Sequence, residues 1–125
     1  MTVMLAFAGA SCVAPEGKVA DARGDAGAGS TWCDVLGVLE AKCQRCHREP
    51  PDHGAPFPLM TYADTQVRKG ILMSLVQSMV LEEVAADRMP AAFVVLDPPV
   101  EALTIAEKNV LLGWSETAPS SLDCP

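Results

Sequence analysis

The sequence predicts an all-α domain of three main helices joined by long, irregular loops. Three segments carry apolar residues at helical spacing, and nothing alternates with a period of two for long enough to indicate a sheet. Proline-rich stretches, EPPDHGAPFP and MPAAFVVLDPPV, separate the helices. Because loops of this length are uncommon in a compact domain, we expect them to wrap around something.

The folded domain is expected over residues 31–125. Residues 1–12 are apolar and end in small residues, like the core and cleavage region of a secretory signal, although the positively charged start is missing. Either the true start of the protein lies upstream of residue 1, or the segment is not an export signal. We expect export. Residues 13–30 hold Ala, Gly and Asp with almost nothing bulky to bury, which predicts a flexible linker.

The first helix should begin near Ser30 or Thr31 as N-cap and lead into Cys43. Its apolar face holds Val35, Leu36 and Leu39. The second helix is expected from about Asp64 to Ala86, although Gly70 is unfavourable in its first turns. Apolar residues cover most of its circumference and predict a largely buried helix: Val67, Ile71, Leu72, Leu75, Val76, Met79, Val80 and Val84.

The third helix carries the clearest start signal. Thr104 stands at the N-cap and Glu107 three residues later, which is a capping box. Four apolar residues follow, and TAPSS ends the helix: Ile105, Val110, Leu111 and Trp114.

The charge balance excludes one class of partner. The chain has 16 acidic and 9 basic residues and a net charge of −7, whereas nucleic-acid binding depends on basic patches. The acidic excess serves either solubility or the attraction of basic partners. Three cations, Lys42, Arg45 and Arg48, lie around Cys43 and Cys46, where they either orient an acidic partner or solvate the helix end.

The motif CQRCH, from Cys43 to His47, is the most specific chemical signal. A thioredoxin-like pair would follow a strand in a βαβ context, which is not predicted here. A zinc site needs a second pair of ligands, and Cys33, His53 and Cys124 are scattered without that spacing. The motif C-x-x-C-H is typical of c-type haem attachment, so we expect one covalently bound haem c, with Cys43 and Cys46 as thioethers and His47 as the proximal iron ligand.

At this point the chain resembles the class I (mono-haem) cytochrome c family, over about residues 31–118. The shared segments are a helix leading into CQRCH, then CHREPPDHGAPFPLMTYAD, RMP, and LTIAEKNVLLGW. The resemblance implies a cytochrome c-like fold, with three main helices and long loops wrapped around the haem. It also implies that the first and last helices pack together, which would allow a Cys33–Cys124 disulfide.

Met89 is the predicted distal iron ligand. It follows a helix end, precedes Pro90 and matches the Met-Pro ligand segment of the family. Met73 and Met79 fall in the buried helix pattern, where core packing is the simpler interpretation. His53 is the other candidate ligand and is more simply an exposed loop residue. The ring of His47 needs an acceptor for its Nδ1–H, which we expect to be a loop carbonyl near Pro56 or Pro58.

Cys12 is left over after these assignments. The residues AGASC resemble a lipobox, which would make Cys12 a lipidated membrane anchor, although Gly9 stands in place of the usual leucine. Cleavage after Ala10 is the alternative. A Cys33–Cys124 disulfide and c-type haem maturation would both require an oxidising, extracytoplasmic compartment such as the periplasm.

The sequence therefore predicts an electron carrier with His/Met axial ligation rather than an enzyme, although it could serve as a module of an oxidoreductase. Its partners would be redox proteins whose identity the sequence does not reveal. The first alternative is a haem-based enzyme subunit or gas-binding sensor, in which Met89 is labile or does not ligate. The second is a zinc or interaction module without haem.

Overall fold

The computed structural model describes residues 29–114, 119 and 121–125. The predicted signal segment at 1–12, Cys12, and nearly all of the predicted linker at 13–30 lie outside the described residues. No helix within the described ranges is both long enough and apolar enough to cross a membrane.

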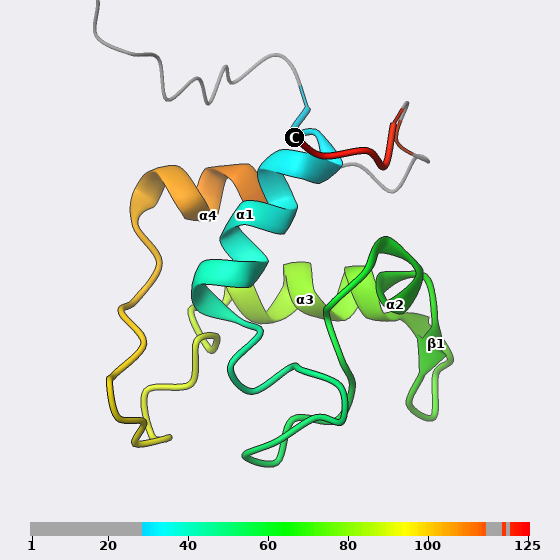
Figure 1. Ribbon diagram of the computed structural model, residues 1–125. Coiled ribbons are helices and arrows are strands. Elements are labelled where there is room, and N and C mark those ends of the chain that lie inside the picture. The colour runs from blue at the N-terminus through cyan, green and yellow to red at the C-terminus, as the bar shows by residue number, and fades with distance from the viewer. Residues whose placement is uncertain (1–28, 115–118, 120) are drawn as a thin grey trace, which may run out of the picture.

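The described residues form four helices and one two-stranded antiparallel sheet (Figure 1). In chain order they are α1 (Trp32–Lys42), α2 (Tyr62–Thr65), β1 (Arg68–Lys69), β2 (Ser74–Leu75), α3 (Val76–Ala85) and α4 (Ile105–Leu112). The prediction of an all-α, cytochrome c-like fold with three main helices is therefore wrong. The long second helix is replaced by α2, the hairpin and the shorter α3.

Local capping chemistry fixes where three of the helices begin. Thr31, Thr61 and Thr104 are the N-caps of α1, α2 and α4, and each belongs to a complete capping box. In each box the threonine hydroxyl accepts a bond from the backbone N–H three residues later, and that residue's carboxylate accepts from the threonine N–H. The predicted capping box at Thr104 is confirmed, and the first helix, expected to start near Ser30 or Thr31, has Thr31 as its N-cap.

A β1–β2 hairpin takes the place of the first half of the expected second helix. Arg68 pairs with Leu75 and Lys69 with Ser74, which leaves a four-residue turn from Gly70 to Met73. Gly70 has a φ of +75° and Met73 a φ of +52°, left-handed values that an α-helix cannot accommodate. Ile71 and Leu72, which were expected to be buried in the second helix, are instead 100% and 88% exposed.

The core lies between α1, α3 and α4 and includes the adjoining loop. Its buried side chains are Trp32, Val35, Val38, Leu39, Phe57, Leu59, Val76, Val80, Val84, Leu111 and Trp114. The Trp32 ring lies 5.9 Å from that of Trp114 and 5.5 Å from that of Tyr62, so aromatic contacts join the start of α1 to the end of α4 and to α2. A Ser30 N–H to Gly113 carbonyl bond of 3.0 Å reinforces the contact between α1 and α4.

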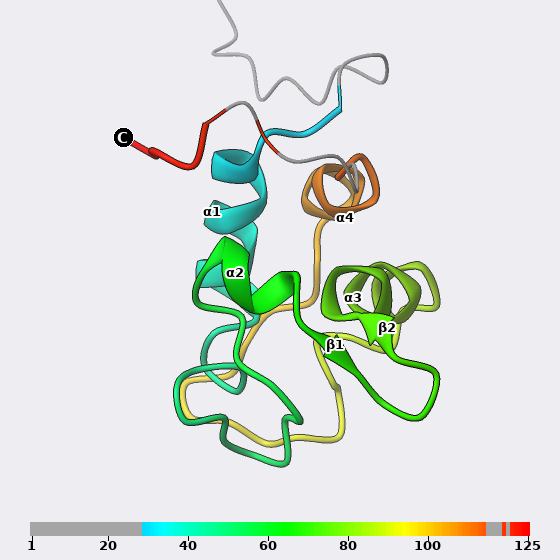
Figure 2. The ribbon, with the colours of Figure 1, turned by 90° about the vertical axis from the view of Figure 1, so that its right-hand side faces the viewer.

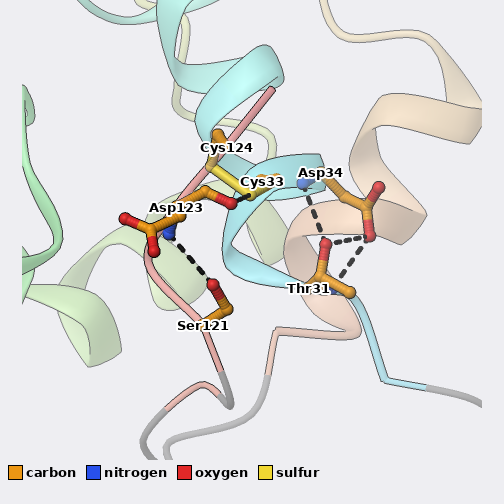
Figure 3. The surroundings of a disulfide bond; sticks show 6 residues. All are labelled: Thr31, Cys33, Asp34, Ser121, Asp123 and Cys124. Atoms are coloured by element: carbon orange, nitrogen blue, oxygen red, sulfur yellow. Dashed lines mark hydrogen bonds between the residues drawn. A yellow bond between two sulfur atoms is a disulfide. The ribbon is translucent and has the colours of Figure 1, made fainter.

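A disulfide joins Cys33, in the first turn of α1, to Cys124 near the C-terminus (Figure 3). This is the pairing that the family resemblance implies. Asp123 and Ser121 beside it are linked by a 3.1 Å hydrogen bond. The disulfide fixes the last residues against α1, so that the first described residues and the C-terminus lie at the same end of the molecule (Figure 2).

Candidate ligand-binding cavity

One apolar cavity of about 740 Å³ lies at the end of the molecule away from the termini. It is bounded by the C-terminal end of α1, one side of α3, and the two loops at residues 47–60 and 90–103, which occupy the lower part of Figures 1 and 2. Its lining is largely aliphatic and aromatic, and its volume falls within the range of small-molecule and cofactor sites. The long loops, which were expected to wrap around something, surround this cavity.

Cys43, Cys46 and His47 share one part of the cavity wall because the chain continues to turn after α1. The N–H of Cys43 donates to the Leu39 carbonyl at 2.8 Å, and the N–H groups of Cys46 and His47 both donate to the Cys43 carbonyl, at 3.2 and 2.9 Å. All three side chains line the cavity, and the two cysteines are free thiols. The wall therefore offers two sulfur nucleophiles and one imidazole side by side.

The ring of His47 is held in one orientation. Its Nδ1 lies 2.8 Å from the Phe57 carbonyl oxygen, between Pro56 and Pro58, where the sequence predicts the acceptor. The Phe57 ring packs 5.2 Å away, and the Leu59 N–H donates to the His47 carbonyl at 2.8 Å. Because a carbonyl oxygen can only accept, Nδ1 carries the proton of the neutral ring and Nε2 carries the lone pair.

Burial controls the protonation of this wall. Desolvation lowers the pKa of His47, with the Phe57 hydrogen bond acting in the opposite sense, so the neutral ring is favoured. Burial also raises the pKa of Cys43 to about 12, with smaller contributions from Cys46 and Glu107. At neutral pH the cavity therefore presents a neutral imidazole and, at Cys43, a neutral thiol.

Two methionines line the cavity. Met89 is half-buried in the loop after α3, and the adjacent Arg88 is held by an ion pair of 2.8 Å to Glu83. Met79 reaches the cavity from α3 and also packs against the core. The sequence singles out Met89 and assigns Met79 to the core alone, because a methionine within a helical apolar pattern carries no signal that distinguishes a lining residue from a packed one. His53 is exposed at the cavity edge, 3.9 Å from the Asp52 carboxylate.

Basic residues around the two cysteines secure the second loop. Arg45 donates to the backbone carbonyls of Asp97 and Pro98, the first at 3.2 Å. Lys42 donates to the Ala102 carbonyl at 3.3 Å and lies 3.6 Å from the Glu107 carboxylate. These cations therefore close the cavity by tying the loop at 97–102 to the end of α1.

The structure corrects the cofactor prediction. Nowhere in 29–114, 119 and 121–125 do three or more His, Cys, Asp or Glu side chains come together as a group able to hold a metal ion. Cys43, Cys46 and His47 line the cavity without forming such a group. On this finding the prediction of one covalently attached haem c is wrong, and the site is described as an apolar cavity with thiol, imidazole and thioether groups in its wall.

Comparisons with family models, with curated proteins and with solved structures give no match. The resemblance to class I cytochromes c, and the iron-ligand roles of His47 and Met89, remain predictions.

Proposed function

We propose that this domain is an extracytoplasmic electron-transfer protein that holds one redox-active group in the cavity. The observation that carries the proposal is the composition of the cavity wall: an apolar hollow of about 740 Å³ with two adjacent free thiols, an oriented neutral imidazole and a thioether. Such a group would supply the electron chemistry, and the chain's own residues would bind it, orient it and exclude water.

The apolar lining suits electron transfer more than it suits catalysis of a polar reaction. Phe57, Leu59, Val80 and Val84 are buried core residues that also line the cavity, so they keep water from a bound group. Burial in apolar surroundings is one of the means by which a protein sets the reduction potential of a bound redox group. Phe93 and Val95, by contrast, are 85% and 93% exposed at the cavity's edge, where a partner could approach.

The sulfur atoms of the wall support contact with a polarisable group. Because burial raises the pKa of Cys43, this residue is a neutral thiol at neutral pH and places no negative charge beside the group. The Cys33–Cys124 disulfide supports maturation in an oxidising compartment.

The test is expression of the exported chain in a bacterial periplasm, followed by native mass measurement and a spectroscopic redox titration. We expect one bound group per chain and a reversible one-electron transition. Cys43→Ser/Cys46→Ser should bind the group more weakly. The matched control, Cys33→Ser/Cys124→Ser, removes two other cysteines and should still bind it. A folded, exported chain without a bound group or redox transition would refute the proposal.

A second pair of variants tests the two thioethers. Met89→Ala should shift the midpoint potential because it removes a polarisable sulfur from the loop beside the group, whereas Met79→Ala should mainly lower stability. The reverse result would assign the sulfur contact to Met79.

A further inference from the structure

The turn of the β1–β2 hairpin, residues 70–73, exposes a set of aliphatic side chains that neither the core nor the cavity uses. Ile71 is 100% exposed, Leu72 88% and Met73 57%, and none of them lines the cavity. Three consecutive large apolar residues in water carry an unfavourable free energy that folding does not remove. This turn, hereafter the hairpin tip, is therefore a candidate contact surface.

The hairpin tip is held in a defined conformation. The Met73 N–H donates to the Gly70 carbonyl at 3.2 Å, and the Arg68 guanidinium donates to the Met73 carbonyl at 3.0 Å across the turn. With the pairing of Lys69 to Ser74, these bonds fix the backbone below the exposed side chains. Figure 2 shows the hairpin projecting from the α2 and α3 side of the molecule.

The charges beside the hairpin tip are unusual for this acidic chain. Arg68 and Lys69 are exposed, and neither has a carboxylate partner among the described residues. Elsewhere in the described ranges, four cations form ion pairs: Lys42, Arg48, Arg88 and Lys108. Arg45, like Arg68, donates to backbone carbonyls. The hairpin therefore combines unneutralised positive charge with exposed aliphatic surface.

We propose that the hairpin tip docks the domain onto an anionic lipid membrane, with Ile71, Leu72 and Met73 entering the interfacial region and Arg68 and Lys69 at the level of the lipid phosphates. Charge complementarity identifies the occupant: basic side chains gain about 1 kcal/mol each near an anionic leaflet. Long basic side chains can extend their charged ends to the headgroups while their stems cover apolar surface. The projecting tip offers only three large side chains, far short of the area of a stable protein–protein interface.

The test is co-sedimentation of the full chain with lipid vesicles. The chain should carry Cys12→Ser, which removes the predicted lipidation site from the comparison. Phosphatidylcholine vesicles containing phosphatidylglycerol are compared with vesicles of phosphatidylcholine alone, at low and high salt. The variants are Ile71→Ser/Leu72→Ser, Lys69→Gln, and the control Ile105→Ser, which removes an aliphatic side chain that is 83% exposed on α4.

We expect wild type to partition preferentially onto the phosphatidylglycerol vesicles. Ile71→Ser/Leu72→Ser should weaken that partitioning by about tenfold or more. Lys69→Gln should weaken it by about fivefold on anionic vesicles alone, because one charge near the leaflet is removed. Ile105→Ser should bind as wild type does. Circular dichroism must show unchanged folding for each variant, and all of these substitutions are at exposed positions.

Three results would overturn the proposal. The first is wild type that stays in the supernatant with anionic vesicles at low salt. The second is a double variant that partitions as tightly as wild type. The third is a wild-type dimer in gel filtration that the double variant abolishes without any vesicle binding, because it would show that the hairpin tip contacts a second copy instead. None of these results depends on whether the cavity holds a redox group.

Discussion

Loss of the Cys33–Cys124 disulfide should destabilise the domain by several kcal/mol. The two residues are 91 apart in sequence, so the bond closes a loop that contains almost the whole folded domain. In the chain-entropy description, a loop of this length removes about 4.6 kcal/mol of conformational entropy from the unfolded state at 25 °C. Measured values for native disulfides are commonly about 2–5 kcal/mol, so we expect Cys33→Ser/Cys124→Ser to lose an amount within that range.

The assay is guanidinium unfolding followed by far-UV circular dichroism, with thermal unfolding as a second measurement. For a domain of this size the corresponding fall in Tm is between about 10 and 30 °C. The starting material should be uniform, either all with or all without the cavity's group, because a bound group adds its own stabilisation. The matched control is Ser121→Ala, which removes the Asp123 to Ser121 hydrogen bond beside the disulfide but leaves the loop closed.

Reduction of the wild type gives an independent comparison. After reduction and alkylation, its unfolding midpoint should approach that of the double variant. A double variant whose free energy of unfolding lies within about 1 kcal/mol of the wild-type value would refute the reasoning. It would mean that the unfolded chain is already compact enough for loop closure to cost little.

Three further predictions concern the cavity wall and the core. Alkylation of the chain lacking a bound group at pH 8, followed by peptide mass mapping, should show Cys43 reacting far more slowly in the folded chain than in the unfolded chain, because a pKa of about 12 in place of 9.0 cuts the thiolate fraction about a thousandfold; equal rates in the two states would contradict this. Because the pKa of His47 is lowered in the folded state, the unfolded chain takes up the proton first as pH falls. The contribution of His47 to stability should therefore be complete above about pH 6.5 and decrease below it, and unfolding curves measured across this pH range should show no such decrease for His47→Gln. Leu111→Ala should lower the free energy of unfolding by about 2–5 kcal/mol because this side chain of α4 is fully buried in the core, and a smaller loss would indicate that the core collapses to fill the space.

Local chemistry explains which parts of the fold are predictable. The starts of α1 and α4 follow from Thr31 and Thr104, because a capping box needs only residues within four positions of one another. The 68–75 hairpin does not follow, because its apolar residues satisfy a helical pattern equally well. Only the left-handed conformations of Gly70 and Met73 reveal the turn, and for Met73 no side-chain preference signals that conformation.

The site shows the same division. The motif from Cys43 to His47 singles out three residues, and the structure places all three in the wall of the cavity. The cofactor does not follow from that motif: haem c was predicted, and the described residues include no group of three or more His, Cys, Asp or Glu side chains that could hold a metal ion. Met79 was missed because lining a cavity and packing a core place the same demand on a methionine: an apolar side chain on the inner face of a helix.

The placement of the two chain ends has a practical consequence. Ser30 bonds to Gly113, and Cys124 is bonded to Cys33, so the described chain both enters and leaves at the pole remote from the hollow. A linker or an additional domain fused to either end would therefore extend away from the cavity. The domain could be attached to another protein through either end without covering the cavity.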